Sequence, residues 1–114
     1  MSAITTHVLD TARGRPAAGI PVRLEQRSRG GEWLAIGRGD TDDDGRLRSL
    51  YPADTALTAG VYRLTFQTHG YFESLGVDAF YPEVVVVFET TPGEGHYHVP
   101  LLIGPFGFTT YRGT

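Results

Sequence analysis

The chain has 114 residues, of which 40% are hydrophobic, and its 10 basic and 13 acidic residues give a formal net charge of −3. This length fits one domain spanning residues 1–114, the hydrophobic content excludes general disorder, and the near-balanced charge without a basic run gives no basis for binding nucleic acid. The absence of cysteine excludes disulfides and thiolate metal ligands. Without an apolar run of about 20 residues or a signal-peptide pattern, we expect a cytoplasmic protein that does not contact membranes.

The first third of the chain predicts three short strands joined by turns. The β-branched segment 5–11 is followed by glycine and proline, which indicates a strand that ends in a turn. In residues 21–26, Val22 and Leu24 alternate with polar neighbours, as expected for a half-buried strand. A glycine-rich link then leads into a strand that begins at Trp33, and the short link predicts a hairpin.

Residues 40–46 form the most polar stretch and contain three consecutive aspartates before Gly45. Consecutive aspartates resemble part of a calcium loop, but the alternating ligands and the distal glutamate of an EF-hand loop are missing. A tight turn is therefore the main prediction, with calcium binding as a minor alternative. Arg46 and Arg48 lie two residues apart, so in extended chain they share a face and one could point toward a site.

The second half of the chain predicts more strands and the only helix. Residues 60–67 alternate as a half-buried strand does, whereas residues 69–78 carry apolar side chains at helical spacing. Residues 82–90 contain the apolar run Val84–Phe88, which predicts a strand covered on both sides. Because a sandwich sheet normally has one wet face, this strand indicates a subunit interface.

Two last strands are expected at residues 97–103 and 106–111, separated by a Gly-Pro turn. Six to eight short strands with frequent turns and one brief helix are typical of an all-β fold, and we predict an antiparallel β-sandwich of about eight strands.

Four histidines are candidates for chemistry: His7, His69, His96 and His98. A histidine within an apolar strand loses hydration unless it finds a polar partner, which favours His98 and His7. His69 and His96 fit exposed positions, and His96 is expected outside the site. The histidines could form a zinc site of His7, His96 and His98, or they could form a metal-free acid–base site. Their spacing does not decide between these two alternatives. No serine lies in a nucleophile elbow.

Three blocks of the sequence together resemble one enzyme family. They are THVLDT at residues 6–11 with the Gly, Pro-Ala and Gly that follow, residues 41–46 ending in Asp-Gly-Arg, and residues 96–114 with HYHVPLL, GPFGF and the closing YRGT. In this order they are similar to the 5-hydroxyisourate hydrolases, the transthyretin-like enzymes of purine degradation. A closing Tyr-Arg-Gly-Ser/Thr distinguishes these hydrolases from the transthyretin hormone carriers.

The resemblance implies a transthyretin-like sandwich of eight strands with one short helix, assembled as a homotetramer whose active sites lie where two dimers meet. It implies catalytic roles for His7, Arg46 and His98, and substrate binding by His7, Arg46, Tyr111 and Thr114. It requires no metal and no cofactor. Thr114 stands where many relatives have serine, which keeps the hydroxyl group.

The implied reaction is hydrolysis of 5-hydroxyisourate to 2-oxo-4-hydroxy-4-carboxy-5-ureidoimidazoline in urate degradation. We expect His7 and His98 to share the orientation and activation of the water, and Arg46 to hold the developing oxyanion or the substrate's ring edge. A transthyretin-like carrier that binds an aromatic ligand without converting it is the main alternative. An adhesion-type sandwich would leave the polar set unexplained.

Overall fold

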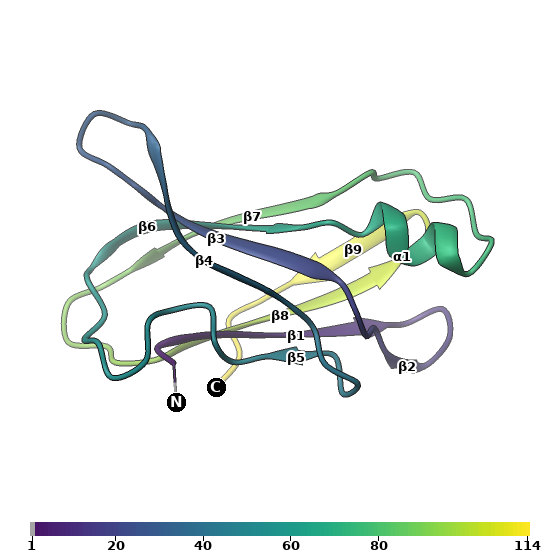
Figure 1. The fold of residues 1–114 in the computed structure, drawn as a ribbon, viewed down its shortest axis with the longest axis horizontal. Coiled ribbons are helices and arrows are strands. Elements are labelled where there is room, and N and C mark those ends of the chain that lie inside the picture. The colour runs from purple at the N-terminus through teal and green to yellow at the C-terminus, as the bar shows by residue number, and fades with distance from the viewer. Residues whose placement is uncertain (1) are drawn as a thin grey trace.

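The computed structural model describes residues 2–114 and consists of two packed β-sheets and one short helix (Figure 1). The first sheet has the strand order β2 (Arg15–Pro16), β1 (Ile4–Asp10), β8 (Tyr97–Gly104) and β9 (Gly107–Thr110), and β5 (Arg46–Leu47) also pairs with β1. The second sheet has the order β4 (Trp33–Asp40), β3 (Pro21–Arg27), β6 (Gly60–Phe66) and β7 (Val84–Thr90). The predicted all-β sandwich with one helix is confirmed.

One strand pairing departs from the predicted antiparallel arrangement. Strands β1 and β8 run parallel, with Thr5 opposite His98 and His7 opposite Pro100, whereas the other pairings are antiparallel. Parallel neighbours need a long connection, and here the chain between β1 and β8 forms the whole second sheet. Because β8 occupies one edge of β1, the short strands β2 and β5 share the other edge.

The core lies between the two sheets and is filled by alternate side chains of each strand. The predicted alternation is confirmed in β3, where Val22 and Leu24 are buried, and in β6, where Tyr62, Leu64 and Phe66 are buried. From the first sheet, alternate residues of β1 and β8 point inward, and the side chains between them therefore lie on the outer face. The alternation of side chains along β1 and β8 thus determines which of their residues can contact a ligand.

Helix α1 (His69–Ser74) is shorter than the segment with helical spacing. Phe72 is its one buried residue, and Ala79 packs against the core from beyond the helix end. Gly76 takes a positive φ of 69°, a conformation that ends a helix. Within residues 2–114, no helix has the length and apolar character needed to cross a membrane.

Strand β7 (Val84–Thr90) is covered on one face only. Val84 and Val86 are buried in the core, whereas Val85 is 43% exposed and Val87 55% exposed. The predicted cover on both faces is therefore not provided within one chain. Since β7 is an edge strand of the second sheet, the subunit interface stays a prediction.

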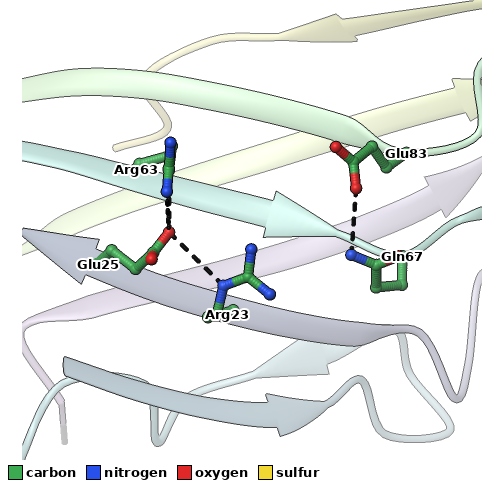
Figure 2. A network of polar contacts seen from close by, with 5 residues as sticks. All are labelled: Arg23, Glu25, Arg63, Gln67 and Glu83. Carbon is green, nitrogen blue, oxygen red and sulfur yellow. Dashed lines mark hydrogen bonds and ion pairs between the residues drawn. The ribbon is translucent and has the colours of Figure 1, made fainter. Parts of the chain in front are cut away.

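The outer face of the second sheet carries a network of ion pairs and hydrogen bonds. Figure 2 shows Glu25 of β3 between Arg63 of β6 and Arg23, with the Glu25 Oε1 atom 2.7 Å from Arg63 Nη2 and 3.5 Å from Arg23 Nε. At the next position along this face, the Gln67 amide donates to Glu83 at 3.3 Å. A hollow of about 510 Å³ beside Arg23, Arg38 and Asp40 lies on the same face. The predicted site residues His7, Arg46 and His98 lie instead on the first sheet.

Candidate active site

The strand register brings the predicted site residues of three strands together on the outer face of the first sheet. Thr5 of β1 lies opposite His98 of β8, and His7 of β1 lies opposite Arg46 of β5. Each of these residues alternates with a buried neighbour, so all four side chains project from the same face. His7, Arg46 and His98, which are far apart in the sequence, therefore form one cluster.

This cluster lines a pocket of about 480 Å³. A volume in this range is typical of sites that bind small organic molecules. Its walls carry two guanidinium groups, three imidazoles and the hydroxyl groups of Thr5 and Thr114, and contain no carboxylate side chain; the lining residues are Thr5, Thr6, His7, Arg46, Arg48, His96, His98 and Thr114. Such walls favour an electron-rich or anionic ligand.

His98 is the best placed general base. Its Nδ1 lies 2.8 Å from the hydroxyl of Thr5, a residue that is only 5% exposed. Burial is the main cause that lowers the pKa of His98 below its usual value, and the positive charge of Arg46 acts in the same direction. The imidazole is therefore neutral at pH 7, and with Nδ1 engaged, Nε2 is the nitrogen left for a ligand.

The turn before β5 fixes both His7 and Arg46. The Asp42 carboxylate accepts hydrogen bonds from the backbone N–H groups of Asp44 and Arg46, each at 2.9 Å. The Asp44 carbonyl lies 2.8 Å from His7 Nε2. Because a carbonyl only accepts, His7 Nε2 carries a proton, and in the neutral ring Nδ1 is the basic nitrogen.

The same contacts decide between the two predictions for the aspartate-rich stretch. Gly45 takes a φ of 77°, and a Cβ there would lie 2.4 Å from the Val8 carbonyl oxygen, so the turn needs glycine. Oδ1 of Asp42 serves the backbone of the turn, and Oδ2 lies 3.9 Å from Nη1 of Arg48 rather than beside other carboxylates. The predicted tight turn is confirmed. Over residues 2–114, no three His, Asp or Glu side chains gather as metal ligands do.

The closing segment packs against His98. The Gly113 N–H donates to the His98 carbonyl at 2.8 Å, and the Arg112 guanidinium lies over the Tyr97 ring at 4.3 Å. Arg112 also contacts the Glu94 carboxylate at 3.5 Å. These contacts hold Thr114 at the pocket wall.

Two residues are placed differently from expectation. Tyr111 does not line this pocket but a separate hollow of about 300 Å³ beside Val86 and Phe88, where it is 56% exposed. The expectation that His96 lies outside the site is wrong, because its ring lines the pocket with its Nε2 3.4 Å from the Thr5 hydroxyl. His69 is exposed on α1 beside Glu73 and lies elsewhere, as expected.

The sequence analysis did not identify Thr5 as a site residue. It placed Arg48 on the face of Arg46 but did not assign it to the site. Thr5 lies two residues before His7, so the period of a strand places both on one face, but only the register with β8 identifies its partner. Arg48 shares the face of Arg46, as the spacing predicted, and both line the pocket. A larger hollow of about 610 Å³ beside residues 54–57 has only His96 in common with this pocket.

The model of the HIUase/Transthyretin family matches residues 4–113. A curated 5-hydroxyisourate hydrolase from Salmonella dublin is 44% identical over 111 residues, which are 97% of this chain and 80% of that protein. The crystal structure of transthyretin from Sparus aurata matches with a TM-score of 0.91 and 33% identity, covering 99% of this chain and 97% of that one. The structure of Klebsiella pneumoniae 5-hydroxyisourate hydrolase matches with a TM-score of 0.85 and 33% identity, covering 100% of both chains.

Proposed function

Because the chain belongs to the HIUase/Transthyretin family, we propose that the pocket between β1, β5 and β8 hydrolyses 5-hydroxyisourate to 2-oxo-4-hydroxy-4-carboxy-5-ureidoimidazoline. The chain is an enzyme of this family: curated relatives at 44% and 41% identity over nearly its whole length are 5-hydroxyisourate hydrolases. The overall fold alone does not separate these enzymes from the transthyretins, since it matches both. The local chemistry of the pocket must therefore support the activity.

The observation that carries the proposal is the convergence of His7, Arg46 and His98 from three strands in one pocket. Hydrolysis of a ring amide needs a base that is neutral at working pH and a group that stabilises negative charge on the carbonyl oxygen. The lowered pKa of His98 meets the first need and the permanently charged Arg46 meets the second. A carrier that only binds its ligand needs neither.

In the proposed mechanism, His98 and His7 hold the attacking water between them. The free Nε2 of His98 takes a proton while the water oxygen bonds to the ring carbonyl carbon, and the carbonyl electrons move onto oxygen. Arg46, with Arg48 beside it in the pocket, stabilises that oxyanion. The carbonyl then re-forms, the ring carbon–nitrogen bond breaks, and the imidazolium of His98 returns its proton to the leaving nitrogen. The carboxylic acid that is formed ionises in water.

Substrate positioning falls to His7, Arg46, Thr114 and Tyr111. The Thr114 hydroxyl lies at the pocket wall and can donate to or accept from a substrate oxygen or nitrogen. Tyr111 lines a different hollow of the same chain, so it meets substrate only if a neighbouring protomer presents it. A homotetramer with active sites between dimers would allow such a contact, and the exposed Val85 and Val87 on the edge strand β7 support an assembly of this kind.

A direct rate measurement tests the proposal. Fresh 5-hydroxyisourate is generated from urate with urate oxidase, and its ultraviolet decay is followed with and without this protein. We expect decay much faster than the spontaneous rate, saturable in substrate and first order in protein. Decay at the spontaneous rate would reject the activity, and tight binding without acceleration would favour the carrier alternative.

A further inference from the structure

The buried hydroxyl of Thr5 lies between two imidazoles of the candidate site. Its Oγ1 is 2.8 Å from Nδ1 of His98 and 3.4 Å from Nε2 of His96. Thr5 is 5% exposed, so this hydroxyl has little access to water and depends on these two rings for its hydrogen bonds. His96 in contrast is exposed and lines the adjoining hollow as well as the pocket.

A hydroxyl group has one proton to donate, so its two neighbours cannot both accept from it. If Thr5 donates to His96 Nε2, it accepts from a protonated Nδ1 of His98, and the lone pair of His98 then lies on Nε2. If Thr5 donates to His98 Nδ1 instead, the proton of His98 sits on Nε2, and the ring has no lone pair for the water. The direction in which the Thr5 hydroxyl donates its proton thus determines whether Nε2 of His98 can act as a base.

We propose that Thr5 is a positioning residue that, with His96 as the acceptor of its proton, holds His98 in the Nδ1–H tautomer. The inference rests on the proposed function for its catalytic meaning, although the tautomer itself is a property of the free protein. Register fixes the contact on which this role depends, because Thr5 and His98 are directly paired residues of the parallel strands β1 and β8. His96 precedes β8 by one residue and lies two residues before His98, so it approaches the hydroxyl from the same face.

Two substitutions separate the two contacts. Thr5→Val removes the hydroxyl but keeps the β-branched shape, and Thr5→Ser keeps the hydroxyl. His96→Leu removes the acceptor at an exposed position, which spares the fold and frees Thr5 to donate to His98. Thr11→Val is the matched control, because the Thr11 hydroxyl donates to the Ile103 carbonyl at 3.1 Å across the opposite end of the same strand pair.

Nitrogen-15 NMR of the histidine rings at pH 7.5 reads the tautomer, and steady-state kinetics reads its effect. We expect the Nδ1–H form of His98 in the unmodified protein, Thr5→Ser and Thr11→Val, and loss of that preference in Thr5→Val and His96→Leu. Loss of a partner that orients a functional imidazole costs about 10- to 100-fold. We expect that loss in kcat with little change in KM for Thr5→Val, a smaller loss for His96→Leu, and recovery in Thr5→Ser.

Several results would overturn this role for Thr5. They are an Nε2–H tautomer of His98 in the unmodified protein, an unchanged tautomer in both Thr5→Val and His96→Leu, or full kcat in a folded Thr5→Val. If the unmodified protein does not accelerate 5-hydroxyisourate decay, the proposed function fails, and the NMR arm still decides the tautomer. If Thr5→Val does not fold, the His96→Leu spectrum and kcat decide the proposal.

Discussion

Replacement of Gly113 by alanine tests whether the closing segment shapes the pocket. A Cβ at this position would lie 2.8 Å from Cδ2 of His98 and 3.1 Å from Cγ of Pro100. Carbon atoms in favourable contact are about 3.5–4.0 Å apart, so relief requires a shift of about 0.7 Å or more. The Gly113 N–H is bonded to the His98 carbonyl at 2.8 Å, which ties the two backbones together. The shift therefore falls on the His98 ring, on Thr114, or on both.

The size of the effect follows from this displacement. Misplacement of a catalytic group by about 1 Å can cost on the order of 100-fold in rate. We therefore expect Gly113→Ala to lower kcat/KM about 10- to 100-fold, which corresponds to about 1.4–2.7 kcal/mol of transition-state stabilisation. The free energy of unfolding should fall by less than about 1 kcal/mol, because the change touches a short surface segment. Initial rates of 5-hydroxyisourate decay and thermal unfolding by circular dichroism measure the two quantities.

Gly107→Ala is the matched control for this experiment. Gly107 begins β9 in the hairpin that leads to the closing segment, and no described atom lies within 4 Å of a Cβ placed there. We expect the unmodified rate from this variant. Unchanged kcat/KM in Gly113→Ala would refute the contact between the closing segment and His98. Equal losses in both variants would assign the effect to the hairpin instead.

Four further predictions follow from the same geometry. His98→Asn or Arg46→Ala should abolish turnover while light scattering gives the same oligomeric state as for the unmodified protein; full turnover in either variant would place the chemistry elsewhere. Deletion of residues 111–114 should abolish activity with little loss of thermal stability, and full activity would make the segment dispensable. The pKa of His98 is lowered in the folded chain. As pH falls from the unfolded value of about 6.5 toward the lower folded value, the unfolded chain therefore binds this proton more readily, and the unfolding free energy decreases. Urea titrations at pH 5 and pH 7 should show a smaller decrease for His98→Asn; an equal one would assign the effect to other groups. Prolonged dialysis against EDTA should leave kcat unchanged, and a loss restored by zinc would support the zinc alternative.

Local sequence patterns predicted the longer strands and the buried faces of β3 and β6. The alternation in residues 21–26 and 60–67 predicted buried side chains that the structure confirms, because a strand facing a core must bury every second residue. The same rule placed Arg46 and Arg48 on one face, and both line the pocket. The Asp-Gly turn was predictable because aspartate and glycine serve its hydrogen bonds and its positive φ.

Contacts between distant segments were not predictable from these patterns. Nothing local to Thr5 indicates that its neighbour across the sheet is His98, since strand register depends on packing over the whole sheet. The exclusion of His96 failed for the same reason. Its exposure was correctly expected, but an exposed ring that precedes β8 by one residue can still reach the rim of the pocket beside Thr5. Tyr111 shows the opposite case, in which a motif residue lies away from the pocket of its own chain.

The core determines the geometry of the site through that register. The core side of β8 buries Tyr97, Val99, Leu101 and Ile103. A slip of β8 by one residue against β1 would turn these four side chains outward and send His98 toward the core. Burying one such side chain contributes about 1.5–3 kcal/mol, so exposing four would cost roughly 6–12 kcal/mol. The inward turn of Leu102 would offset only part of this cost. The position of His98 beside Thr5 therefore does not depend on the hydrogen bond between them, because packing on the opposite face of the sheet fixes the strand register. The core thus sets the register that brings the outward-facing residues of β1, β5 and β8 together in one pocket.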